Sequence, residues 1–130
     1  MTPEQLQQMS RDLARLLPEE LLPNREGKHA EDADYVGIVC FRDELYEAHA
    51  GWRRKQVPVW LHESTEACAE IMVRVLWPNE ICINGGLREA WANRNDLDDY
   101  RLVYVENDNP MQAFRTVVCL AAIEVLSKEK

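Results

Sequence analysis

The chain has 130 residues, of which 46% are hydrophobic and 29% are charged. This length suits one domain that buries about two-thirds of its unfolded surface, and the composition excludes an intrinsically disordered chain. The formal net charge is −8, from 23 acidic and 15 basic side chains. Because a phosphate-binding surface needs clustered Lys and Arg, this charge argues against nucleic acid as a partner.

The N-terminal segment carries the signals of a helix. Thr2 can cap it, Pro3 suits its first position, and Gln5 stands where a capping box places the reciprocal side chain. Pro18 either ends this helix or begins a short extra turn. Its apolar face is predicted to consist of Leu6, Met9, Leu13, Leu16 and Leu17.

A polar stretch, residues 24–34, lacks periodicity and contains Gly27, and we predict a flexible loop there. The β-branched and aromatic residues of 35–41 predict a buried strand. Residues 42–51 fit either a helix ended by a glycine or a ribbon that continues the sheet. The "VPVW" that follows is predicted to be extended, because a residue before proline favours β geometry.

An amphipathic helix is predicted from Ser64, which can cap it, to Pro78, which closes it. On its polar face Glu70 and Arg74 stand four residues apart in the favourable order, worth roughly 0.2–0.5 kcal/mol. Its apolar face is predicted to consist of Ala67, Cys68, Ile71, Met72, Val75 and Leu76.

Two strands are predicted after this helix, at 80–84 and 100–106, and the two glycines at 85–86 indicate a turn or hairpin tip. Residues 87–99 fit either a wide loop with one helical turn or an irregular strand around Trp91.

The closing helix is predicted to start with Asn109 as cap, Pro110 at the first position and Gln112 as the partner of a capping box. Its run "VVCLAAIEVL" has ten residues, whereas a membrane span needs about 20 apolar ones, so we predict no membrane contact. The run is apolar more than halfway round. The apolar side chains that do not face the sheet are covered either by the N-terminal helix or by the same helix of a second copy, so both a monomer and a homodimer remain possible.

The order of these elements predicts an α+β (or α/β) fold. We expect one domain over 1–130, with a small sheet of three to four strands covered by helices in a layered sandwich.

Two segments resemble a known family. Residues 60–76, a polar lead into Ser-Thr-acid and an amphipathic helix, are similar to the first helical signature of the phage "ABA sandwich" proteins. Residues 106–126, a polar cap, a proline and an Ala/Leu-rich helix, look like their closing signature. The resemblance implies a layered α/β/α fold and a phage or prophage origin, and it carries no catalytic motif.

The four cysteines, Cys40, Cys68, Cys82 and Cys119, are too far apart for a zinc knuckle or a redox motif. The first ten residues lack the basic start and apolar core of a secretory signal. We therefore predict free thiols and a cytoplasmic location. In an oxidising compartment the four thiols could pair instead.

Motifs for bound groups are missing, so we predict no cofactor and no metal. No two histidines have the helical spacing of a zinc pair, and "INGGL" lacks the lysine of a phosphate loop. A calcium loop counted from Asp96 would need glycine where Arg101 stands. The nearest approach to a ligand cluster is Asp43, Glu44, Glu47 and His49, which we interpret as solvated surface charges.

A catalytic site could still assemble from residues distant in sequence, and Cys82, His62 and Glu63 are the candidates. A nearby cation stabilises a thiolate and makes it available as a nucleophile, but no sequence pattern brings these three residues together.

The strongest candidate for a contact surface lies in "HAGWRRKQVPVW", because Trp and Arg are the commonest energetic anchors of interfaces. The predicted partner-binding residues are Trp52, Arg53, Arg54, Lys55 and Trp60. The alternative is that both tryptophans face the core while the basic side chains balance nearby acids.

These observations favour a non-enzymatic accessory protein of phage or prophage type. It would bind a host or phage protein, for example to inhibit a defence or regulatory complex. The alternative is a small enzyme or accessory subunit.

Overall fold

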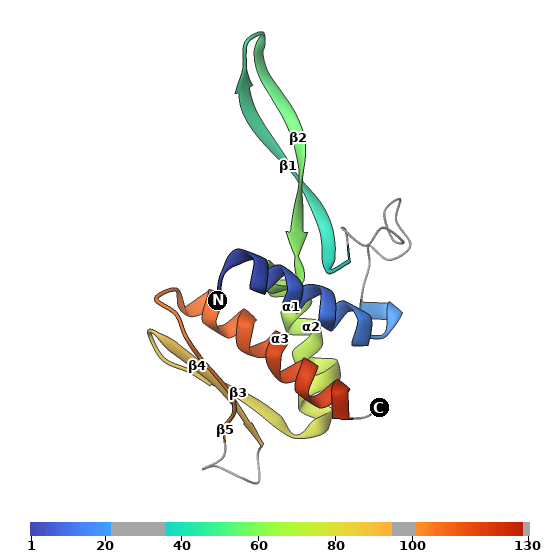
Figure 1. The fold of residues 1–130 in the computed structure, drawn as a ribbon, viewed down its shortest axis with the longest axis vertical. Helices are drawn as coiled ribbons and strands as arrows, with labels where there is room; N and C mark the ends of the chain where they lie inside the picture. Colours follow the sequence, from blue (N-terminus) through green and yellow to red (C-terminus); the bar gives the residue numbers. More distant parts are fainter. Residues whose placement is uncertain (22–35, 95–100, 129–130) are drawn as a thin grey trace.

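The computed structural model describes residues 1–21, 36–94 and 101–128, so the loop predicted at 24–34 lies outside the described residues. Over these residues the fold is α+β, with three α-helices, a three-stranded sheet and a separate two-stranded ribbon. In Figure 1 the helices and the three-stranded sheet form a body, from which the ribbon extends.

The first helix, α1 (Pro3–Leu16), has the predicted capping box. The backbone N–H of Thr2 donates to the side chain of Gln5 at 2.8 Å, and the N–H of Gln5 donates to the Thr2 hydroxyl at 3.2 Å. A short 3₁₀ turn, η1 (Glu19–Leu21), follows Pro18. The buried face includes Ser10 and Ala14 beside the predicted leucines, whereas Leu16 is half-buried.

The ribbon consists of β1 (Ile38–Ala48) and β2 (Gly51–Trp60), paired antiparallel with a bulge near the base. His49 and Ala50 form its turn, and Gly51 follows with φ at +108°, which glycine adopts without strain. Residues 42–48 are therefore extended, as the ribbon alternative predicted, but the ribbon does not continue the three-stranded sheet. The strand expected at 35–41 begins this ribbon and does not join the three-stranded sheet.

The second helical segment changes geometry along its length. A 3₁₀ turn, η3 (Leu61–Glu63), leads into α2 (Thr65–Ile71), where the Ser64 hydroxyl caps the N–H of Ala67 as predicted. A π-helical turn, η4 (Met72–Leu76), and another 3₁₀ turn, η5 (Trp77–Asn79), complete it. The Glu70–Arg74 ion pair is confirmed, at 3.1 Å.

The sheet has the order β3 (Ile81–Gly85), β4 (Glu89–Arg94) and β5 (Arg101–Glu106), all antiparallel. The glycines at 85–86 lie at the tip of the β3–β4 hairpin, as predicted. Of the two interpretations of residues 87–99, the strand around Trp91 is right for 89–94.

The last helix, α3 (Pro110–Lys128), is capped by Asn109, whose side chain accepts from the N–H groups of Met111 and Gln112. The predicted capping box differs in one respect. The N–H of Asn109 donates to the side chain of Asn107 at 2.9 Å, so Asn107 takes the place expected of Gln112.

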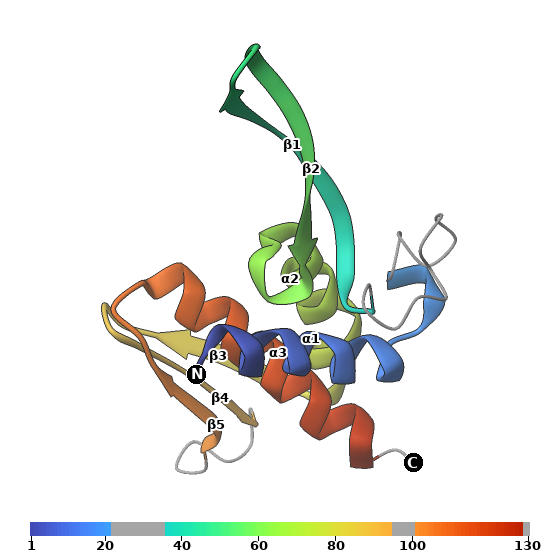
Figure 2. The same ribbon diagram turned by 45° about the horizontal axis from the view of Figure 1, so that its top comes forward.

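The apolar run of α3 lies at the centre of the body. The helix packs on β3, β4 and β5 on one side and on α1 and α2 on the others (Figure 2). Val117 and Val118 are fully buried although they point in different directions round the helix. The second cover is therefore α1, as one of the two alternatives predicted.

By length and composition alone, α3 could also cross a membrane, with a mean hydropathy of 1.3 over its most apolar window. It is the one such helix in the described part of the chain. A core helix has the same composition, and eight of its side chains are buried within this fold.

Candidate interaction surface on the ribbon

The outer part of the ribbon, residues 42–56, is covered by no helix or sheet of the described chain. Strands of this length span about 30 Å. In both Figure 1 and Figure 2 the ribbon extends away from the body. An isolated two-stranded ribbon is marginally stable in water, so a ribbon this long gains from a further contact.

The pairing register places "WRRK" on both faces of the ribbon. Trp52 pairs with Glu47 and Arg54 with Leu45, while Arg53 pairs with Tyr46 and Lys55 with Glu44. Paired residues share a face and successive residues alternate. We call the first the tryptophan face; it carries Leu45, Glu47, Trp52 and Arg54. The second is the basic face; it carries Arg42, Glu44, Tyr46, Arg53, Lys55 and Val57.

The two predicted tryptophans have different environments. Trp52 is 69% exposed near the tip, whereas Trp60 is 8% exposed at the base. Arg11 of α1 lies 5.0 Å from the ring centre of Trp60, a cation–π contact that joins the ribbon to the body. Trp60 is therefore buried, as the alternative interpretation expected of both tryptophans, whereas that interpretation is wrong for Trp52. Trp52, Arg53, Arg54 and Lys55 are all exposed.

The ribbon differs in charge from the rest of the chain. It holds four of the 15 basic residues and three of the 23 acidic ones, which gives +1 for the ribbon and −9 for the remainder. The basic face accounts for the difference, because three basic side chains lie there with one carboxylate, Glu44. Arg42 pairs with that carboxylate at 2.7 Å.

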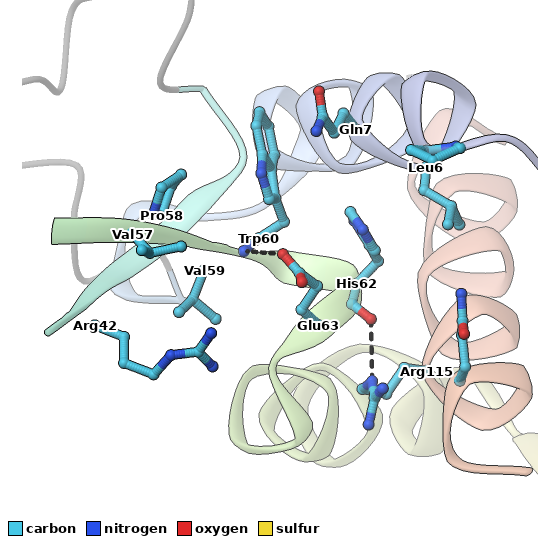
Figure 3. A pocket seen from close by; sticks show the side chains of 12 residues that line it. Leu6, Gln7, Arg42, Val57, Pro58, Val59, Trp60, His62, Glu63 and Arg115 are labelled. Atoms are coloured by element: carbon cyan, nitrogen blue, oxygen red, sulfur yellow. Dashed lines mark hydrogen bonds between the residues drawn. The ribbon is translucent and has the colours of Figure 1, made fainter. Parts of the chain in front are cut away.

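A cavity of about 540 Å³ opens where the ribbon meets the body (Figure 3). Side chains from α1, both strands, η3 and α3 line it, including Arg42, Val59, Trp60, His62, Glu63 and Arg115. Arg42 and Val59 lie on one side of the ribbon in Figure 3 and Pro58 lies on the other.

Hydrogen bonds fix the polar wall of this cavity. His62 Nδ1 lies 2.7 Å from the Ser10 hydroxyl, which also accepts the backbone N–H of His62 at 3.2 Å. Arg115 donates from Nε to the His62 carbonyl at 3.1 Å and from Nη1 to the Thr65 hydroxyl at 3.3 Å. Glu63 accepts the N–H of Trp60 at 3.2 Å.

Burial lowers the pKa of His62; Glu63 opposes this shift and Arg115 adds to it. The neutral ring is therefore favoured in the folded protein. It can accept the Ser10 hydroxyl proton at Nδ1, which joins α1 to η3.

The hydrogen-bonded pair of His62 and Ser10 predicts that the folded protein loses stability on acidification. As pH falls, His62 of the unfolded chain takes up a proton around its ordinary pKa of 6.5. In the folded protein His62 takes up its proton only at lower pH, because its pKa is lowered. The contribution of His62 is therefore complete above pH 6.5 and is lost as pH falls through the folded pKa.

The measurement is chemical denaturation of the native protein and His62→Gln between about pH 7 and pH 5. We expect the free energy of unfolding to fall more for the native protein than for the variant. Parallel curves would contradict the assignment.

The structure does not assemble the catalytic set suggested by the sequence. His62 and Glu63 line the cavity, but Cys82 lies on β3, where its thiol contacts the Asn93 side chain at 3.3 Å. Ser10, beside His62, is fully buried and cannot meet a substrate. Sequence reasoning missed Ser10 and Arg115. Ser10 lies on the predicted apolar face of α1, and Arg115 lies just before the apolar run of α3, and these positions are the signals that could have indicated them.

The four residues considered as metal ligands in the sequence lie on different parts of the ribbon. Asp43 and Glu47 lie on the tryptophan face, Glu44 on the basic face and His49 in the turn. Within residues 1–21, 36–94 and 101–128, no group of three His, Cys, Asp or Glu could hold a metal ion.

The four thiols are free and differ in access. Cys40 is exposed, while Cys68 and Cys119 are buried. The hydrogen bond with Cys68 and burial raise the pKa of the Cys119 thiol well above its ordinary value. Because the thiolate is the reactive form, Cys119 is expected to be inert in the folded protein.

Alkylation of the native protein should therefore label Cys40 first, and Cys68 and Cys119 only after unfolding. Mass spectrometry of iodoacetamide-treated protein, with Cys40→Ser as the control, checks this order. Labelling of Cys119 at the rate of Cys40 would contradict the packing.

Comparison of the chain with known protein families, with curated proteins and with solved structures finds no match.

Proposed function

We propose that this protein acts by binding another protein through its ribbon, as a non-enzymatic accessory protein of phage or prophage type. The partner is a host or phage protein, such as a component of a defence or regulatory complex. The carrying observation is the exposed ribbon, which offers Leu45, Trp52, Arg53 and Arg54 on a scaffold with no cover from the described body.

The energetics of interfaces support this use. Trp52 and Leu45 are 69% and 62% exposed, so a partner that covers them removes large apolar side chains from water. Burial of one such side chain contributes about 1.5–3 kcal/mol. Exposed Trp and Arg side chains are also the types that most often dominate binding energy.

Shortening the ribbon tests the proposal. Arg42 pairs with Val57, so residues 43–56 can be replaced by Asn-Gly, which closes a tight hairpin on that pair. We expect the shortened protein to fold with the stability of its body, because the removed residues pack on each other. We expect it to lose its partner in a tagged pull-down from host lysate, read by mass spectrometry.

The matched control is Val73→Ser with Trp77→Ser, which removes exposed apolar side chains from the body. This variant should recover the same partner as the native protein. Recovery of that partner by the shortened protein would contradict the proposal.

A further inference from the structure

The basic face of the ribbon continues into the cavity at its base. Arg53, Lys55 and Val57 follow each other along one side of β2, and Arg42 lies opposite Val57 on β1. Arg42 and Val57 also line the cavity, where Arg115 of α3 completes the same surface. One strip thus runs from the ribbon tip to the body.

From this continuity we propose that an extended acidic segment of the partner lies along the basic face and ends in the cavity. The inference rests on the proposed function and specifies the chemistry of the partner.

Charge supports an acidic segment. Arg53 and Lys55 have no ion pair with any described carboxylate, and Lys55 lies 5.6 Å from the ring centre of Tyr46. The one carboxylate on this face, Glu44, is already paired with Arg42. A partner carboxylate therefore meets unneutralised positive charge on a chain whose net charge is −8.

Spacing supports an extended segment. Arg53 and Lys55 are two residues apart on a strand, so their side chains are separated by about 7 Å along it. In an extended peptide, alternate side chains on one side repeat at the same distance. Carboxylates at every second position therefore match the basic side chains.

The cavity can hold the end of the segment. Arg115 uses Nε and Nη1 for the His62 carbonyl and the Thr65 hydroxyl, and a guanidinium has further N–H groups for a carboxylate. Val57, Val59 and Trp60 provide an apolar wall beside it. The site thus combines an apolar wall with Arg115 as a fixed cation, while the Glu63 carboxylate in the same lining accepts the N–H of Trp60.

The test uses the full chain and a fluorescein-labelled peptide of about ten residues that alternates Glu and Val, a length that matches the ribbon. Fluorescence anisotropy measures its binding, with a Lys/Val peptide and a single-stranded DNA of similar length as comparisons. We expect the Glu/Val peptide to bind at least about tenfold more tightly than either comparison. Its affinity should fall as ionic strength rises from about 0.01 to about 0.1 M.

Variants locate the site. Arg42→Glu with Arg53→Glu should lower the affinity for the Glu/Val peptide by about tenfold or more. Arg74→Glu with Lys128→Glu makes the same change of net charge on the body, and should leave affinity within about twofold. Gln112→Glu adds a carboxylate to the cavity lining and should also weaken binding. Thermal melting checks that each variant folds.

Equal losses in the two double variants, equal binding of DNA, no preference for the Glu/Val peptide, or unchanged binding by Gln112→Glu would each overturn the inference. The proposed function fails separately, when the shortened ribbon still recovers the partner from lysate.

Discussion

Replacement of Arg53 and Arg54 by Glu is expected to abolish partner binding, with a loss of affinity of about 100-fold or more, because like charges placed across an interface cost several kcal/mol. The two residues lie on opposite faces of the ribbon, so the pair disturbs both faces at once. Both are exposed, and the melting temperature should stay within about 2 °C of the native value. Pull-down and calorimetric melting measure the two effects.

The matched control is Arg74→Glu with Lys128→Glu, which makes the same change of charge on the body. Each of these residues has one exposed ion pair within its own helical segment. The control should bind as the native protein does. Retained binding by a folded Arg53→Glu/Arg54→Glu protein would remove this surface from consideration, and the single variants show which face matters more.

Gly37→Ala is expected to cause the largest loss of stability, roughly 2–5 kcal/mol. Gly37 has φ at +96°, and a Cβ there would lie 2.8 Å from the Ser10 carbonyl carbon and 2.9 Å from the Arg11 nitrogen. Both are backbone atoms of α1, so relief requires the helix to move. The Gly37 carbonyl also accepts the N–H of Leu61 at 2.9 Å. Urea denaturation measures the loss.

Gly51→Ala separates the two causes of that loss. Its φ of +108° imposes a similar backbone strain, but a Cβ there has no neighbour within 4 Å. Its cost should be the strain alone, about 1–3 kcal/mol. Equal costs for the two variants would show that the close approach of the ribbon base to α1 contributes nothing.

Local chemistry predicted the helices well. Thr2, Ser64 and Asn109 cap the helices that their positions indicated, because a cap depends on residues within one turn. The change to π geometry at Met72–Leu76 was not predicted, since the same apolar spacing fits either kind of helix.

The ribbon shows where local chemistry is insufficient. Residues 42–51 lack a decisive periodicity, and strand pairing with 51–60 decides their structure. Once the strand is known, alternation separates Arg53 from Arg54, so the adjacent residues "WRRK" do not form one patch.

The sequence indicated Trp60, His62 and Glu63 as candidate residues, but it did not predict that they line a cavity with α1 and α3. His62 forms hydrogen bonds with Ser10, 52 positions away in the sequence, and with Arg115, 53 positions away, and no sequence motif predicts contacts over such separations. The family resemblance covers His62 and Arg115 but assigns neither of them a role. Three-dimensional packing alone brings these side chains together.

The separation of charge between ribbon and body also has a kinetic consequence. A chain with +1 on an arm and −9 behind it carries a large electric dipole along that arm. In the field of an acidic surface such a molecule turns before contact, so the arm arrives first and a larger share of collisions is productive. Added salt would then slow association much more than it speeds dissociation, and the arm would set the speed of recognition as well as its strength.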